Sequence, residues 1–112
     1  MNWIGLDIGT TSVSLAALDA EEGRLLKAVT LANASALPGE PYAALQDPGK
    51  IVAICREGLD GLLADYPETA RIGLTGQMHG LVYADRTGMA VSPLYTWQDQ
   101  RGGLPYRDGR TY

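Results

Sequence analysis

Three runs of residues near the start of the chain, 2–7, 13–19 and 24–31, have the composition of β-strands, and the first is mostly apolar and ends in an acid. A tight turn with glycine at its bend, residues 7–12, links the first two strands. A polar, glycine-containing turn at residues 20–23 links the second to the third. Consecutive strands joined by such short turns predict an antiparallel meander. This arrangement argues against a dinucleotide-binding unit, in which the glycine turn after the first strand leads into a helix and not into a second strand.

A helix is predicted from Asp47, as the N-cap, and Pro48, at the first helical position. Its apolar residues fall on one stripe: Ile51, Cys55, Leu59, Leu62, Leu63 and Tyr66. Gly58 and Gly61 each weaken the helix by about 1 kcal/mol relative to alanine, and glycine there permits close packing on a sheet. Pro67 ends the helix, and Cys55 is expected to be a buried small hydrophobe.

The remaining segments are shorter. Residues 33–46 are expected to form a loop, residues 71–75 a strand, and residues 81–84 and 89–91 the two arms of a small hairpin. The expected fold is therefore α/β, in the order β-β-β-α-β with an added hairpin, and the helical crossover predicts that strand 71–75 lies parallel to a meander strand. Residues 1–101 are expected to form an incomplete domain, and residues 102–112 a loop or frayed tail.

Composition excludes several classes of protein. The chain has 112 residues, 46% of them hydrophobic, which suits one globular domain. Nine basic and thirteen acidic side chains give 9 − 13 = −4, which argues against nucleic acid as a partner. One cysteine excludes an internal disulfide and a cysteine-rich zinc site, and with one histidine a metal site would have to rest mainly on carboxylates. There is no apolar run long enough to span a membrane and no signal-peptide pattern, so we expect a cytoplasmic protein.

The segment 7–12 is the first candidate site. Backbone N–H groups of a glycine turn can face a phosphate, hydroxyls add donors, and a carboxylate can hold Mg²⁺ directly or through water. The candidate residues are Asp7, Gly9, Thr10, Thr11 and Ser12. The alternative, about as well supported by spacing, is a plain hairpin whose hydroxyls cap their own backbone.

Two further segments carry polar side chains suited to a small ligand. In residues 75–80, Gln77 and His79 can orient a hydroxylated molecule, although a turn with a satisfied histidine and a core-filling Met78 explains these residues more simply. In residues 95–101, an extended chain would place Trp97, Asp99 and Arg101 on one face, as in a carbohydrate site. The alternative is that Trp97 anchors a core and that Asp99 and Arg101 form an exposed ion pair.

Taken in order, four segments resemble the N-terminal part of the FGGY carbohydrate kinases, which belong to the actin- and hexokinase-like ATPase superfamily. The segments are Gly-Leu-Asp-Ile-Gly-Thr-Thr-Ser (5–12), Gln-Asp-Pro (46–48), Gly-Gln-Met-His-Gly (76–80) and Trp-Gln-Asp-Gln-Arg (97–101). The resemblance spans almost the whole chain and implies a partial RNase H-like domain. It also implies Mg-ATP as cofactor and phosphorylation of a sugar or polyol hydroxyl in a cleft between two such domains.

The resemblance also implies roles for single residues. Asp7 would organise Mg²⁺ and the phosphates, and Gly9 to Ser12 would form the first phosphate hairpin. Contacts to the sugar would come from Gln77, Met78, His79, Trp97 and Asp99, with Arg101 supporting the loop. The Met-His pair resembles the ketose-specific branch, the sedoheptulokinases and xylulokinases.

Family members are several times longer, and their catalytic aspartate lies beyond the positions present here. We therefore expect the isolated chain to be inactive and to be a kinase fragment. The alternatives are a non-catalytic sugar-binding or regulatory module and another ATPase of the superfamily, such as an Hsp70-like or acetate-kinase-like domain. The segments 76–80 and 97–101 argue against the second alternative, because they resemble the sugar side of the kinase cleft. An uncovered sheet edge is also expected to permit self-association.

Overall fold

The computed structural model describes residues Met1–Tyr112, which form two units. Unit 1 consists of Met1–Ala34 and Lys50–Gln77, and unit 2 of Ser35–Gly49 and Met78–Tyr112. The elements are β1 (Asn2–Ile8), β2 (Ser12–Asp19), β3 (Arg24–Ala32), β4 (Ala36–Leu37), β5 (Leu45–Gln46), α1 (Pro48–Asp65), β6 (Thr69–Gly76), β7 (Leu94–Tyr95) and a short 3₁₀ turn, η1 (Arg101–Gly103). None of the helices is long and apolar enough to cross a membrane.

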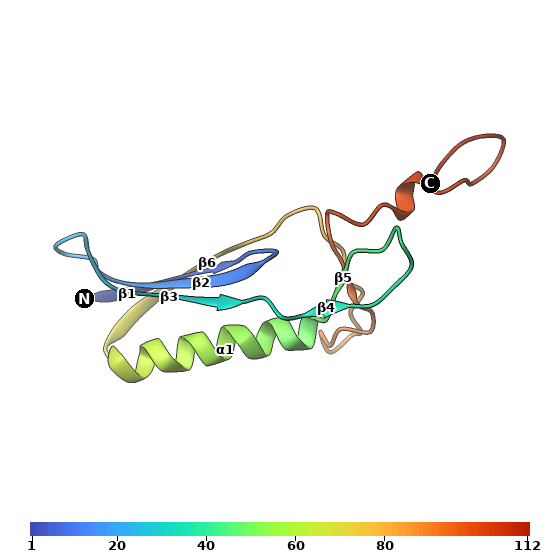
Figure 1. Cartoon of the computed structure of the whole chain (residues 1–112). Helices are drawn as coiled ribbons and strands as arrows, with labels where there is room; N and C mark the ends of the chain where they lie inside the picture. The colour runs from blue at the N-terminus through green and yellow to red at the C-terminus, as the bar shows by residue number, and fades with distance from the viewer. The chain divides into compact units, whose positions relative to one another are not determined.

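Unit 1 is a four-stranded sheet in the order β3-β2-β1-β6, with α1 along one face (Figure 1). β1 pairs antiparallel with β2 and parallel with β6, and β2 pairs antiparallel with β3. The meander, the helical crossover and the order β-β-β-α-β predicted from the sequence are therefore confirmed.

The hydrophobic core lies between the sheet and α1. Its buried residues alternate along β1 and β2 and recur along α1: Ile4, Leu6, Val13, Leu15, Ala17, Ile51, Cys55 and Leu62. The side chain of Asp47 accepts a hydrogen bond from the N–H of Gly49 at 2.9 Å, which confirms Asp47 as the N-cap of α1. Cys55 is buried in this core, as expected.

The two glycines of α1 have different surroundings. A Cβ on Gly58 would lie 2.5 Å from Cδ1 of Leu15, which is itself buried in the core, so the absence of a side chain lets the helix approach β2 closely. A Cβ on Gly61 would have no atom within 4 Å. The expectation of close packing on the sheet is therefore confirmed for Gly58 and wrong for Gly61.

Unit 2 is built differently, around the two-residue strands β4, β5 and β7. The expected loop 33–46 thus contains β4 and β5, two strands too short to leave a periodic signal.

The expected hairpin arms 81–84 and 89–91 are joined only by an isolated bridge between Ala84 and Ala90. Side chains take backbone donors at both ends of this bridge and so compete with a longer ladder. The carboxylate of Asp85 accepts the N–H groups of Thr87 and Met89 on the turn side, and the hydroxyl of Ser92 accepts the N–H of Tyr83 on the other.

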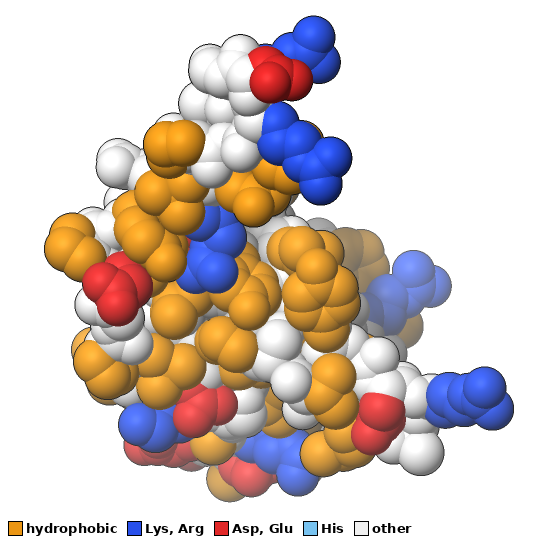
Figure 2. Space-filling view, turned by 90° about the vertical axis from the view of Figure 1, so that its right-hand side faces the viewer, with side chains coloured by type: hydrophobic (Ala, Val, Ile, Leu, Met, Phe, Trp, Pro, Cys, Tyr) orange, Lys and Arg blue, Asp and Glu red, His pale blue; other side chains and the backbone are white.

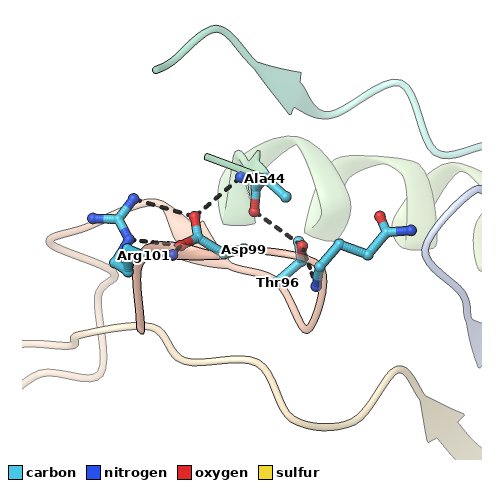
Figure 3. Close-up of polar contacts among 5 residues, drawn as sticks. Ala44, Thr96, Asp99 and Arg101 are labelled. Carbon is cyan, nitrogen blue, oxygen red and sulfur yellow. Dashed lines mark hydrogen bonds and ion pairs between the residues drawn. The ribbon is translucent and has the colours of Figure 1, made fainter. Parts of the chain in front are cut away.

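No hydrophobic residue of unit 2 is fully buried, and its buried residues are the polar Ser35, Gln46 and Thr96. The unit is instead joined by hydrogen bonds between residues 42–44 and 96–100 (Figure 3). Thr96 donates its N–H, at 3.0 Å, and its hydroxyl, at 2.9 Å, to the carbonyl of Ala44. Asp99 accepts the N–H of Ala44 at 3.0 Å, so two residues of one segment hold a single residue of the other.

The segment 95–101 is not extended, contrary to the expectation that Trp97, Asp99 and Arg101 share one face of a strand. The N–H of Asp99 donates to the carbonyl of Thr96 at 3.0 Å, which closes a turn, and η1 follows. The cause is local: the hydroxyl of Thr96 and the carboxylate of Asp99 accept the N–H groups of Gln98 and Arg101, which favours a turn over a strand.

Asp99 and Arg101 form a partly buried ion pair, not the exposed one considered from sequence. The side chain of Asp99 is 4% exposed, and its Oδ1 lies 2.7 Å from Nε of Arg101. The Arg101 guanidinium, helped by the N–H groups of Ala44 and Arg101, holds the pKa of Asp99 at about 2, although burial alone would raise it. Its charge is therefore retained throughout the ordinary pH range.

The two glycines of α1 predict opposite effects of alanine. Gly61→Ala is expected to stabilise the chain by about 1 kcal/mol, because it removes the conformational penalty of glycine and meets nothing. Gly58→Ala is expected to destabilise it by about 1 kcal/mol or more, because overlap with Leu15 outweighs that gain. Urea unfolding followed by far-ultraviolet circular dichroism measures both. Equal stabilisation by the two variants would contradict the close approach at Gly58.

Asp99→Asn is expected to destabilise unit 2 by about 1 to 3 kcal/mol at pH 7, because it removes charge-assisted hydrogen bonds. A carboxyl whose folded pKa is lowered stabilises the fold above its unfolded pKa, and this stabilisation is lost as the pH falls toward about 2. The stability difference between the two proteins should therefore shrink between about pH 4 and pH 2. Trp97 fluorescence in a Trp3→Phe background reports on unit 2 alone, and Asp60→Asn, an exposed change on α1, is the control. A difference that does not change with pH would contradict the role of the charge.

Candidate functional site

The turn between β1 and β2 is closed by a hydrogen bond from the N–H of Gly9 to the carbonyl of Ser12, at 2.9 Å. A Cβ on Gly9 would lie 2.7 Å from that carbonyl oxygen, so only glycine allows the turn to close this tightly. Thr10 and Thr11 form its tip. The hydroxyl of Thr10 donates to Oε1 of Gln77 at 3.3 Å, so it makes a contact outside its own turn.

Asp7 lies next to this turn, on the sheet face opposite α1. Its neighbour Leu6 is buried in the core, and successive side chains of a strand point to opposite faces, so Asp7 is exposed on the other face. Its register partners are Ser14 on β2 and Thr75 on β6, whose hydroxyls therefore share that face. A shallow groove of about 510 Å³ crosses the sheet here and is lined by all three.

Ser14 and Thr75 were not identified from the sequence. The signal that would have found Thr75 is its place at the carboxyl end of β6, since β6 runs parallel to β1 and the ends of parallel strands meet at one edge of the sheet. Ser14 follows from the antiparallel register with β1, which the length of the turn sets.

The donor set beside the turn fits a hard divalent cation such as Mg²⁺, because it offers only oxygen: the carboxylate of Asp7 and nearby hydroxyls. No group of three or more histidine, cysteine or acidic side chains could hold a metal by itself. One carboxylate suits Mg²⁺, which usually keeps several waters and binds one or two carboxylates together with the phosphates of a substrate.

Gln77 lies at the end of β6, and its N–H donates to the carbonyl of Ile8 at 2.8 Å. This bond extends the pairing of β1 with β6 by one residue and brings the Gln77 side chain to Thr10. Gln77, expected to contact a sugar, is thus brought together with the candidate phosphate turn. Both belong to unit 1.

Met78 and His79 begin the second segment of unit 2. Met78 is 71% exposed, so the alternative that it fills a core is wrong. His79 is also exposed and has φ 58°, a left-handed conformation that is uncommon outside glycine. Gly80 follows it, and a Cβ there would lie 3.0 Å from Cδ1 of Leu94, so a larger residue would require the Leu94 side chain to shift by a few tenths of an ångström.

His79 and Asp99 line one hollow of about 330 Å³ in unit 2, together with Leu81, Tyr83, Tyr95, Thr96 and Arg101. The guanidinium of Arg101 lies 4.3 Å from the centre of the Tyr95 ring, and Tyr83 meets Tyr95 edge-on. Tyr83 was not identified from the sequence, because nothing in the pattern of residues 81–84 distinguishes a residue that lines a hollow from a strand residue. Tyr95 lies in the candidate segment 95–101, but no role was assigned to it.

Trp97 is not part of that lining. Its side chain is 54% exposed, so the alternative that it anchors a core is also wrong. Hydrophobic side chains are exposed over much of the face in Figure 2, with charged side chains scattered among them. In unit 2 the exposed large residues include Met78, Leu81, Tyr83, Met89, Val91 and Trp97. An exposed tryptophan and tyrosines beside polar groups suit contact with a sugar, whose rings carry both apolar and hydroxyl faces.

Three kinds of comparison agree on the relatives of this chain. The model of the FGGY family of carbohydrate kinases, N-terminal domain, matches residues 2–103. A xylulose kinase from Staphylococcus xylosus is 30% identical over 107 residues, which cover 94% of this chain and 22% of that protein. A sedoheptulokinase from Mus musculus is 34% identical over 124 residues, which cover 88% of this chain and 26% of that protein.

The crystal structure of xylulose kinase from Rhodospirillum rubrum superposes with a TM-score of 0.80 at 26% identity and covers 92% of this chain and 22% of that one. The expected fold, part of the actin-like N-terminal domain of sugar kinases, is thereby confirmed. The chain spans about a fifth to a quarter of the length of these relatives. By the match of residues 2–103, the chain belongs to the FGGY family of carbohydrate kinases, within the family's N-terminal domain.

Proposed function

We propose that this chain supplies the phosphate-contacting and sugar-contacting segments of an ATP-dependent kinase whose acceptor is a ketose. The observation that carries the proposal is the tight Gly9–Ser12 turn beside an exposed aspartate, in a chain that belongs to a carbohydrate kinase family. The choice of a ketose is supported by relatives named for xylulose and sedoheptulose, which are both ketoses.

On the phosphate side, Gly9, Thr10, Thr11 and Ser12 would face the phosphates of ATP, and Asp7 would hold Mg²⁺ directly or through a water molecule. The ion, when bound, offsets negative charge on the phosphates. This role is supported by the oxygen-only donor set and by the exposure of Asp7 on a face free of α1. The chain's own contribution is to hold the turn at one fixed place at the end of β1.

On the sugar side, the proposed contacts are Gln77, Met78, His79, Trp97 and Asp99. The exposed Met78, His79 and Trp97 are available to a ligand. The imidazole of His79 would exchange hydrogen bonds with a sugar hydroxyl, and Trp97 would cover an apolar face of the sugar. The proposed role of Asp99 is mainly structural. Its carboxylate already accepts hydrogen bonds from Ala44 and Arg101, so it would act by fixing the loop that carries Trp97.

The 112-residue chain by itself is proposed to bind without phosphorylating. Phosphoryl transfer requires the nucleotide, the metal ion and an acceptor hydroxyl in line, with a base to take its proton. The family resemblance assigns that base to a position beyond residue 112. Binding of a sugar without turnover would also be the behaviour of a non-catalytic sugar-binding module.

The first test is a nuclear magnetic resonance titration of the chain with Mg-ADP and, separately, with D-xylulose. We expect Mg-ADP to shift the amide signals of residues 9–12 and the ketose to shift those of residues 78–80 and 97. Asp7→Asn should weaken Mg-ADP binding about tenfold, because it removes the charge that faces the ion, whereas Asp60→Asn should not. A coupled assay should detect no ketose-dependent release of ADP.

The contrary results are distinct. Shifts confined to other parts of the chain would overturn the assignment of the two segments. Turnover at ordinary kinase rates would overturn the proposal that the chain only binds. Binding of the ketose together with no response to Mg-ADP at any concentration would favour the sugar-binding module.

A further inference from the structure

The carbonyl oxygens of the turn 8–12 are nearly all hydrogen-bonded within unit 1. Ile8 accepts from the N–H of Gln77 at 2.8 Å, and Ser12 accepts from the N–H of Gly9 at 2.9 Å. The side-chain amide of Asn33 donates to the carbonyl of Gly9 at 2.9 Å. The backbone N–H of the same Asn33 donates to the carbonyl of Thr11 at 3.0 Å.

These bonds matter for an anion because a carbonyl oxygen carries partial negative charge and repels a phosphate, whereas an N–H group attracts it. A glycine turn is as well able to present carbonyls as N–H groups. The groups that bind the carbonyls therefore determine which way the peptide groups of the turn point. Here Asn33 donates hydrogen bonds to two of these carbonyls, those of Gly9 and Thr11.

The two side-chain amides come from opposite sides of the turn. Asn33 follows β3, two strands away from β1 in the sheet, and Gln77 follows β6, the strand on the other side of β1. Asn33 holds the backbone of the turn, and Gln77 accepts from the hydroxyl of Thr10 at 3.3 Å. The turn is thus held from both flanks of the sheet by groups that carry no charge and so do not compete for a cation or a phosphate.

We infer that Asn33 and Gln77 are positioning residues for the phosphate turn: together they form a clamp that turns its carbonyls away from a bound phosphate and fixes the hydroxyl of Thr10. This inference rests on the proposed function, since it assumes that the turn binds the phosphates. It adds Asn33, which follows β3 and belongs to none of the chemistry-bearing segments of the sequence, and it gives Gln77 a role toward the nucleotide side.

The clamp is tested first without any ligand. In Asn33→Ala and in Gln77→Met, amide hydrogen exchange at Gly9 should become about tenfold faster, the size expected for one lost hydrogen bond. Exchange at Leu15, in the core, should not change. Asn2→Ala, at the other end of β1, and Gln100→Met, exposed in unit 2, are matched controls. Unchanged exchange at Gly9 in both clamp variants would overturn the clamp.

The second measurement uses Mg-ADP and D-xylulose as probes on the same proteins. Both clamp variants should bind Mg-ADP about tenfold more weakly. The affinity for the ketose should stay unchanged in Asn33→Ala, because Asn33 is not among the proposed sugar contacts. Gln77→Glu separates the clamp from general destabilisation: its carboxylate still accepts from Thr10, so exchange at Gly9 should stay slow, while the added charge should weaken Mg-ADP binding.

The outcomes separate the two proposals. Faster exchange with unchanged Mg-ADP affinity would overturn the positioning role, and so would equal loss of affinity for both probes in Asn33→Ala. Failure of the unmodified chain to bind Mg-ADP would overturn the proposed function and, with it, the phosphate role of the clamp, even if the exchange results were as expected. Circular dichroism of each variant shows whether it folds. If Asn33→Ala does not fold, Gln77→Met, which is similar in size to the original residue, tests the clamp in its place.

Discussion

The parallel pairing of β1 with β6 is the constraint on which the candidate phosphate site depends. It joins segments separated by α1 and sets Asp7 beside Thr75 and Ile8 beside Gly76. The pairing requires that α1 cross the sheet closely, and the close approach of Gly58 to Leu15 makes that crossing possible. The close packing of Gly58 on Leu15 thus supports the strand register that aligns Asp7 with Thr75 on the opposite face of the sheet.

The two units are stabilised by different forces. Unit 1 has an apolar core between a sheet and a helix, so the side chains at its candidate turn lie outside that core. In unit 2 the same side chains must do both tasks: Asp99 lines the hollow and also ties residues 42–44 to the loop that carries Trp97. On the proposed function, substitutions of Asp99 would therefore alter folding and ligand contact together, whereas changes at Asp7 need not.

Much of unit 1 could be predicted from sequence, because its strands, its helix and the N-cap Asp47 are specified by local patterns that its core reinforces. Unit 2 could not be predicted to the same extent. Its strands have two residues each, and its turns are set by Asp85, Thr96 and Asp99 capturing backbone N–H groups, which leaves no periodic signal. In the candidate site, Asp7 and the turn were evident from composition and spacing. The strand register was needed to identify three further residues, Ser14, Thr75 and Asn33. Nothing in the local sequence marks them, because their importance comes from the residues that they contact or lie beside in the sheet.

The near absence of a buried apolar core in unit 2 has a thermodynamic consequence. The heat-capacity increase on unfolding arises from newly hydrated apolar surface, and exposure of polar groups lowers it. The side chains of unit 2 that would supply this increase, such as Met78, Met89 and Trp97, are already in water in the folded chain. Melting of unit 2 should thus carry an enthalpy that depends little on temperature, and the curvature of the stability profile of the whole chain belongs almost entirely to unit 1. Cooling should therefore reduce the stability of the sheet and helix more steeply than that of the hydrogen-bonded loops.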